Sequence, residues 1–107
     1  LSDSVVAFSS AIWFWMTPQG YKPACHDVMV GNWIPQDADL QANRLPGFGL
    51  TLNIINAPQC GVDPAEPTLR RYQYFDDFCR LFGVDKGENC DCARQTPFGK
   101  NKTAMSN

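Results

Sequence analysis

The stretch "WFWMTPQGYKPACHDV", Trp13–Val28, holds a dense aromatic run followed by Gln19, Lys22 and the chain's single histidine. Aromatic side chains belong mostly to packed cores, but they also line ligand pockets. The segment "TPQG" does not extend a helix, so the stretch predicts a helix that ends near Met16 and then an ordered loop. We expect mostly core aromatics, a structural histidine, and Gln19 and Lys22 as candidates for a binding groove.

Composition limits what kind of protein this is. The chain has 107 residues, 44% of them hydrophobic and 19% charged, which is typical of one globular domain. Its formal net charge of −2 argues against nucleic-acid binding, which normally requires a basic face. No apolar run of about 18 residues is present, so we expect no membrane-spanning segment.

The first helix is expected to start after a cap at Ser2 or Asp3 and to run to about Met16. Apolar residues cover more than half of its circumference, which predicts burial on most sides. A chain of 107 residues is small for surrounding such a helix, and its first residue is Leu1 rather than Met. We therefore expect a mature, trimmed or partial chain that lacks partner structure.

Further elements follow from local signals. Pro35 is expected to open a short polar helix, "PQDADLQANR". The β-branched residues in Leu50–Ile55 favour a strand by propensity alone. An amphipathic stripe predicts a helix over about Pro67–Phe82, capped by Gly83. The paired aspartates of the two polar helix faces are expected to be solvated: Asp37 and Asp39, Asp76 and Asp77.

Five cysteines in 107 residues favour disulfides in an oxidising compartment, because no CxxC pair has metal-site spacing. The odd count leaves at least one thiol free or paired elsewhere. Cys90 and Cys92 are the obvious tethers for the loop after Gly83. We expect no metal and no cofactor. Asn101 begins an N-glycosylation sequon, a weak signal that is consistent with secretion.

Three segments in this order carry a family resemblance: "AIWFWMTPQGYKPACHDVMVGNW", "RLPGFGLTLNIIN" and "FGVDKGENCDC…QTPFG". From about Ala7 to Gly99 the chain resembles the C-terminal part of class I/II plant chitinases of glycoside hydrolase family 19. The resemblance implies a mainly α-helical, lysozyme-like bilobal domain with a cleft for chitin. Residues 1–98 would be its C-terminal part and 99–107 a polar tail. Leu50–Asn56 would then be helical.

The resemblance also implies an activity. The family hydrolyses β-1,4-linked N-acetylglucosamine with inversion, using two glutamates that lie in the N-terminal half of its domain. Glu66 and Glu88, the only glutamates here, match neither position. The resemblance thus implies that the whole protein is a secreted or vacuolar endochitinase with a role in plant defence. This chain would be inactive alone and would partner the missing N-terminal part of the domain.

By motif position, several residues resemble those of the family's site. Asn56, with Ile55 beside it, matches a sugar-binding asparagine, and an amide suits this task because it both donates and accepts. Lys22 matches a lysine that lines the groove, with Gln19 on the same loop. Arg71 matches an arginine that supports the catalytic acid. Cys60 and Cys92 match the family's C-terminal disulfide.

The segment "NIINAPQC" departs from the family pattern, because Gln59 stands where an acidic residue usually falls. That acid normally shares the arginine's charge, so Arg71 is left less compensated, which would lower the pKa of the catalytic acid. This departure keeps open an alternative, a chitinase-like protein that binds chitin oligomers or cell-wall glycans without cleaving them. A third interpretation is a structural fragment that folds only with its N-terminal half.

Overall fold

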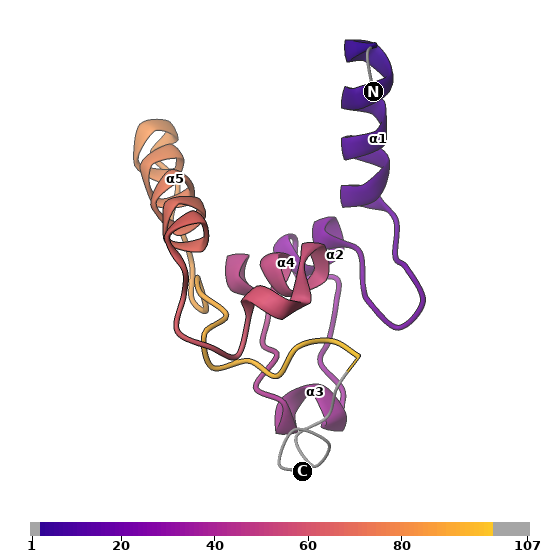
Figure 1. The fold of residues 1–107 in the computed structure, drawn as a ribbon, viewed down its shortest axis with the longest axis vertical. Helices are drawn as coiled ribbons and strands as arrows, with labels where there is room; N and C mark the ends of the chain where they lie inside the picture. Colours follow the sequence, from indigo (N-terminus) through magenta and orange to yellow (C-terminus); the bar gives the residue numbers. More distant parts are fainter. Residues whose placement is uncertain (1–2, 100–107) are drawn as a thin grey trace.

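A computed structural model describes residues 3–99 of the chain, and its regular secondary structure in this range is helical (Figure 1). No strand occurs in that range; Gln19 and Lys22 form an isolated antiparallel bridge. The mainly α-helical expectation is confirmed. The elements are α1 (Ser4–Met16), α2 (Cys25–Met29), α3 (Asp37–Gln41), α4 (Phe48–Ile55), the 3-10 helix η1 (Ala57–Gln59) and α5 (Glu66–Phe82).

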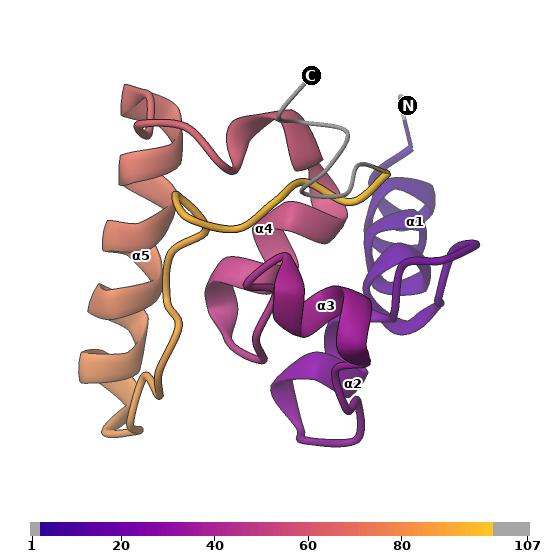
Figure 2. The ribbon, with the colours of Figure 1, turned by 90° about the horizontal axis from the view of Figure 1, so that it is seen from below.

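Helix α4 lies at the centre, with α1 and α5 on opposite sides of it (Figures 1 and 2). Its Leu50 and Ile54 pack in the main core, against which Phe14 and Trp15 of α1 are partly buried. Removing such side chains from water is the main stabilising term of a small domain. The other buried members of this core come from α2, η1 and the C-terminal segment: Cys25, Val28, Ala57 and Phe98.

The strand expected at Leu50–Ile55 is wrong, because this segment is part of α4. Residues 49–54 are all buried, so no polar face marks a helical period. Close backbone packing demands a small residue at the start of the helix. A Cβ at Gly49 would lie 2.1 Å from the carbonyl oxygen of Asp91, in the C-terminal segment. Tertiary packing therefore overrides the local strand propensity.

Helix α1 has the predicted bounds, since the Asp3 carboxylate accepts a 2.8 Å hydrogen bond from the Val5 amide and the helix ends at Met16. Its burial differs from the prediction, because no residue of α1 is buried within the described structure. Phe8 is 74% and Trp13 60% exposed. The other residues of the range 3–99 leave most of α1 exposed, so among its aromatic residues the predicted core position holds only for the partly buried Phe14 and Trp15.

Helix α3 is shorter than expected. Pro35 precedes it, and Gln36 caps it in a reciprocal capping box with Asp39. Asp39 is also not simply solvated, since its Oδ1 lies 3.0 Å from Nε of Arg44, and both side chains are largely buried. The Arg44 guanidinium stacks over the Phe98 ring at 4.6 Å. This pair therefore attaches α3 to the C-terminal segment.

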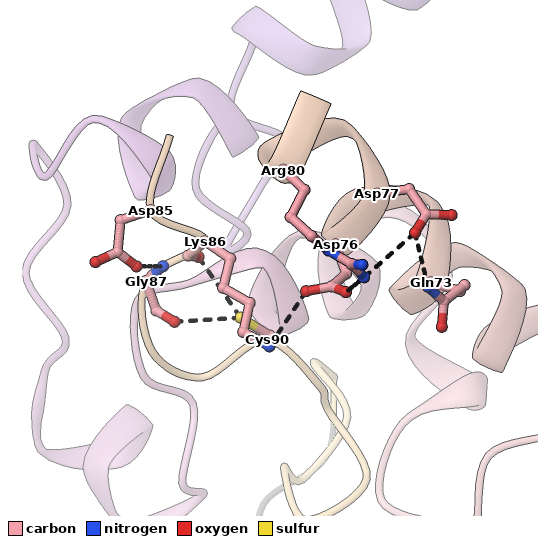
Figure 3. Close-up of polar contacts among 8 residues, drawn as sticks. All are labelled: Gln73, Asp76, Asp77, Arg80, Asp85, Lys86, Gly87 and Cys90. Atoms are coloured by element: carbon pink, nitrogen blue, oxygen red, sulfur yellow. Dashed lines mark hydrogen bonds and ion pairs between the residues drawn. The ribbon is translucent and has the colours of Figure 1, made fainter. Parts of the chain in front are cut away.

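Helix α5 matches its prediction within one residue and ends at Gly83, whose φ of 67° is left-handed. Asp76 is ion-paired rather than solvated, with Arg80 one turn later and with Lys86, whose Nζ lies 3.3 Å away (Figure 3). Asp77 remains largely exposed. The face of α5 that includes Asp76 is thus held by the segment that follows the helix.

The predicted disulfide between Cys60 and Cys92 is present, with a Cα–Cα distance of 5.0 Å. Cys25, Cys79 and Cys90 are free thiols. Beyond the disulfide the chain crosses α4, where the buried Asn53 accepts a 2.9 Å hydrogen bond from the Phe98 amide. The predicted glycosylation site, Asn101, lies outside the described residues.

Candidate functional site

The C-terminal end of α4 is where several predicted site residues meet. Lys22, on the loop after α1, donates a 3.0 Å hydrogen bond from Nζ to the carbonyl oxygen of Ile54. The last carbonyls of a helix have no partner within the helix, and a cation there is favourable. Lys22 is therefore fixed at the end of α4 and also stabilises it.

The loop that carries Lys22 is held by reciprocal backbone hydrogen bonds of 3.0 Å between Gln19 and Lys22. The Gln19 side chain is exposed. Gln19 thus lies on the same turn as Lys22, but no hydrogen bond within residues 3–99 connects its side chain to α4. Whether it belongs to the site stays a prediction.

Asn56 is the C-cap of α4, and its backbone amide donates a 2.9 Å hydrogen bond to the Leu52 carbonyl. Its backbone carbonyl accepts a 3.2 Å hydrogen bond from the amide of Gln59, so both backbone polar groups of Asn56 are hydrogen-bonded. Its side chain is exposed and makes no hydrogen bond with any of residues 3–99. The carboxamide is therefore available both to donate to and to accept from a ligand.

Ile55 and Arg71 border the same hollow between α4 and α5, of about 340 Å³. Ile55 is 49% exposed, so part of its side chain is open to a ligand. We call this feature the α4–α5 hollow; Arg71 is the charged residue in its otherwise largely apolar lining. The remaining lining residues are Trp15, Phe48, Thr51, Leu52, Tyr74, Phe75 and Phe78.

Gln59 binds Arg71 directly. Its Oε1 accepts hydrogen bonds from Nη1 of Arg71 at 2.8 Å and from Oγ1 of Thr68 at 3.0 Å. Its Nε2 donates to the Leu52 carbonyl at 3.1 Å, so both ends of the amide are used. Among the described residues no carboxylate forms an ion pair with Arg71. Its positive charge is therefore held in place by a neutral group.

The structure thus brings together Lys22, Ile55, Asn56 and Arg71 around one end of α4. Sequence reasoning missed the aromatic part of the hollow. Tyr74 and Phe78 follow Arg71 at helical spacing, so the amphipathic pattern of α5 contained that signal. His26 is half-buried in α2, and its structural role stays a prediction; residues 3–99 contain no cluster of metal-binding side chains.

Comparison with known proteins assigns the chain to a family. Residues 1–92 match the sequence profile of the family described as chitinase class I, glycoside hydrolase family 19. The match covers most of the chain, and the chain belongs to this family. No helix within residues 3–99 has the length and apolar character needed to cross a membrane.

Plant proteins named as chitinases are similar to it. Endochitinase 3 of Solanum tuberosum is 50% identical over 99 residues, which are 92% of this chain and 31% of the relative. Chitinase 9 of Oryza sativa subsp. japonica is 45% identical over 104 residues, 96% of this chain and 31% of the relative. The endochitinase of Carica papaya is 48% identical over 99 residues, which are 92% of this chain and 41% of the relative. The chain spans about a third of most of these relatives.

Proposed function

We propose that the whole protein is an endochitinase that hydrolyses β-1,4-N-acetylglucosamine linkages with inversion, and that this chain forms one wall of its substrate cleft. The observation that carries the proposal is the grouping of Lys22, Ile55 and Asn56 at one end of α4, beside Arg71, in a class I chitinase chain. The similar plant proteins named endochitinases support it.

The chemistry of these side chains suits an amino-sugar polymer. The free carboxamide of Asn56 pairs with the N-acetyl group or a hydroxyl of the sugar. Ile55 offers an apolar surface for the acetyl methyl group, next to the largely apolar α4–α5 hollow. Gln19 extends the polar wall along the loop that Lys22 anchors. Few polar groups on a largely apolar surface are typical of small-molecule sites.

The catalytic carboxylates are proposed to come from the rest of the domain. Inversion needs two carboxyl groups about 6.5–9.5 Å apart, with room for a water between them. Of the two glutamates here, Glu66 forms an exposed 2.6 Å ion pair with Arg70, and Glu88 lies on an exposed loop beyond α5. Neither matches the family's catalytic positions, so this chain alone is inactive.

The partner of this chain is proposed to be the N-terminal part of the same domain. Exposed apolar side chains on α1 support this, because isolated soluble domains rarely leave so much continuous apolar surface in water. The strongly exposed ones are Val5, Phe8, Ile12 and Trp13 on α1, and Phe78, Leu81 and Phe82 on α5.

The test is an assay of the purified whole protein on N-acetylglucosamine hexamer, followed by proton NMR of the anomeric signals. The expected first product is the α-anomer. Asn56→Ala should lower kcat/KM about tenfold to a hundredfold, because one polar contact made in the transition state is lost. Asn32→Ala, on the exposed loop after α2, is a matched control and should change it little. A β-anomer as first product would contradict inversion.

A lectin-like function is the second candidate, favoured by the neutral Gln59 beside Arg71 and by the stiff Ala57-Pro58 pair after Asn56. It predicts micromolar binding of the hexamer in calorimetry with no release of reducing ends. Asn56→Ala would then weaken binding. Cleavage of the hexamer by the whole protein would overturn this candidate.

Secretion or vacuolar targeting and a role in plant defence are also proposed. The Cys60–Cys92 disulfide supports an oxidising compartment, because such bonds are rare in cytosolic proteins. Fractionation of the source tissue into apoplastic wash, vacuoles and cytosol, followed by immunoblotting, tests the location. A cytosolic signal alone would contradict it.

A further inference from the structure

The segment after α5 turns back and runs along that helix (Figures 1 and 2). Lys86 pairs with Asp76 at 3.3 Å, and the Cys92 amide donates a 3.0 Å hydrogen bond to the Tyr72 hydroxyl. These contacts hold the returning segment, residues 84–92, against one face of α5. The turn itself is closed where the Val84 amide donates to the Cys79 carbonyl at 2.9 Å.

Cys79 lies on this covered face. Tyr72, Asp76 and Cys79 are spaced by four and three positions, which aligns them along one side of a helix. Cys79 is only 7% exposed, whereas the preceding residue, Phe78, is 56% exposed. The returning segment is therefore what shields the Cys79 thiol from water.

Cys90 lies on the returning segment, next to the face of α5 that carries Asp76. Its Sγ lies 3.4 Å from the Gly87 carbonyl oxygen and 3.5 Å from that of Lys86, the residue that pairs with Asp76 (Figure 3). Both Asp76 and Cys90 line a cavity of about 410 Å³ between the helix and the segment. Burial raises the pKa of the Cys90 thiol, and the neighbouring Cys79 thiol adds to the rise.

From this placement we propose that Cys79 and Cys90 form a second disulfide when the protein matures in an oxidising environment. The two thiols lose two protons and two electrons as the sulfur–sulfur bond forms. The electrons reduce a small-molecule disulfide, such as glutathione disulfide, to two thiols. Cys90 exchanges its weak hydrogen bonds to the Lys86 and Gly87 carbonyls for the covalent bond.

The proposed bond would leave one unpaired thiol among the five cysteines of this chain. With Cys60–Cys92 already formed, a Cys79–Cys90 bond leaves only the buried Cys25 as a free thiol. The second bond lies inside the loop closed by the first, so the two are nested. Together they would fix both the C-terminal half of α5 and the returning segment to the chain at Cys60, directly after η1.

Peptide mapping of the whole protein, purified without reductant and equilibrated with glutathione disulfide, tests the proposal. The protein is denatured, alkylated with iodoacetamide and cut with trypsin and Asp-N. Cleavage before Asp91 separates Cys90 from Cys92, so each pairing appears as a distinct peptide pair. We expect Asp77–Arg80 joined to Gly87–Cys90, and an alkylated Cys25. Alkylated Cys79 and Cys90, or either one joined to glutathione or to another cysteine, would overturn the proposal.

Two variants separate the bond from other effects of mutation. Cys90→Ser removes it and should leave Cys79 open to alkylation in the denatured, non-reduced protein. It should also lower the melting temperature of the oxidised protein by a few degrees. After reduction, the variant and the wild type should melt at about the same temperature. Cys25→Ser, the matched control, should keep the Asp77–Arg80 to Gly87–Cys90 pair intact.

Discussion

The Arg71 guanidinium donates a 2.8 Å hydrogen bond to the side-chain oxygen of Gln59. The amide also donates to the Leu52 carbonyl at 3.1 Å, so its orientation is set by both ends. A carboxylate in the same pose would bring its second oxygen against that carbonyl. These contacts fit an amide, and no carboxylate within residues 3–99 pairs with Arg71 at the border of the α4–α5 hollow.

The first prediction concerns the pH profile of chitin hydrolysis by the whole protein. Gln59→Glu places a negative charge beside Arg71, which should reduce the arginine's effect on the catalytic acid proposed above and raise that acid's pKa. A general acid works in its protonated form, so the alkaline limb of kcat/KM should move up by about 0.5–1 pH unit. Gln41→Glu, at the end of α3, adds the same charge elsewhere and should move it little. An unchanged limb would show that Arg71 does not act on the acid.

The second prediction concerns Lys22. Lys22→Met removes the 3.0 Å hydrogen bond to the Ile54 carbonyl and the charge at the end of α4, while keeping most of the side chain's apolar bulk. The free energy of unfolding should fall by about 1–2 kcal/mol in urea denaturation. We also expect kcat/KM on chitin oligomers to fall about tenfold, because Asn56 follows the loosened helix end.

Arg70→Met is the control for that variant. It removes a positive charge that forms a single ion pair in the described structure, an exposed pair with Glu66. Surface pairs of this kind contribute little to stability, so both quantities should stay near wild type. If Lys22→Met behaves like Arg70→Met, the contact with Ile54 has no role in positioning the site.

The third prediction concerns the disulfide between Cys60 and Cys92. Its loss through Cys92→Ser should destabilise the protein by roughly 3–4 kcal/mol in the chain-entropy model. Differential scanning calorimetry, with and without reductant, measures this. The reductant should lower the melting temperature of the wild type far more than that of Cys92→Ser. Equal shifts would mean that the bond adds no stability.

The fourth prediction concerns Cys25, whose burial beneath α4 raises the pKa of its thiol from 9.0 to about 11. Near pH 8 its thiolate fraction should be about a hundredfold below that of an ordinary thiol, and alkylation of the native protein correspondingly slow. The unfolded chain ionises first, so stability should be unaffected below pH 9 and should fall as the pH rises from about 9 to 11. Rapid labelling of Cys25 in the native protein at pH 8 would contradict this.

The sequence predicted best the helix that has a solvent-exposed polar face. Helix α5 has a polar face and a glycine cap, so its period and its end are visible in the residues. Helix α4 has no such face, because its residues 49–54 are all buried, and only the family resemblance predicted that it is helical. The burial of α1 was inferred from its own composition, which says nothing about whether covering residues are present.

The membership of the candidate site stays a prediction, and the contacts that group its residues were not predicted. Motif position selected Lys22 and Asn56 as candidates, but the hydrogen bond from Lys22 to the Ile54 carbonyl joins residues 32 positions apart and has no local signature. The ion pair between Arg44 and Asp39 likewise has no local signature. Both side chains are largely buried, although the sequence predicted that Asp39 is solvated. Such contacts depend on how the helices pack against one another, which hydrophobic periodicity does not encode.

The bond between Cys60 and Cys92 makes residues 60–92 a covalent ring that encloses the whole of α5. The exposed loop at Lys86 lies in this ring and offers a trypsin-type protease a place to cut. A single cut there opens the ring but releases no fragment, because the disulfide still joins both sides. A nicked molecule would thus migrate as one species in a non-reducing gel, and proteolytic damage would become visible only after reduction.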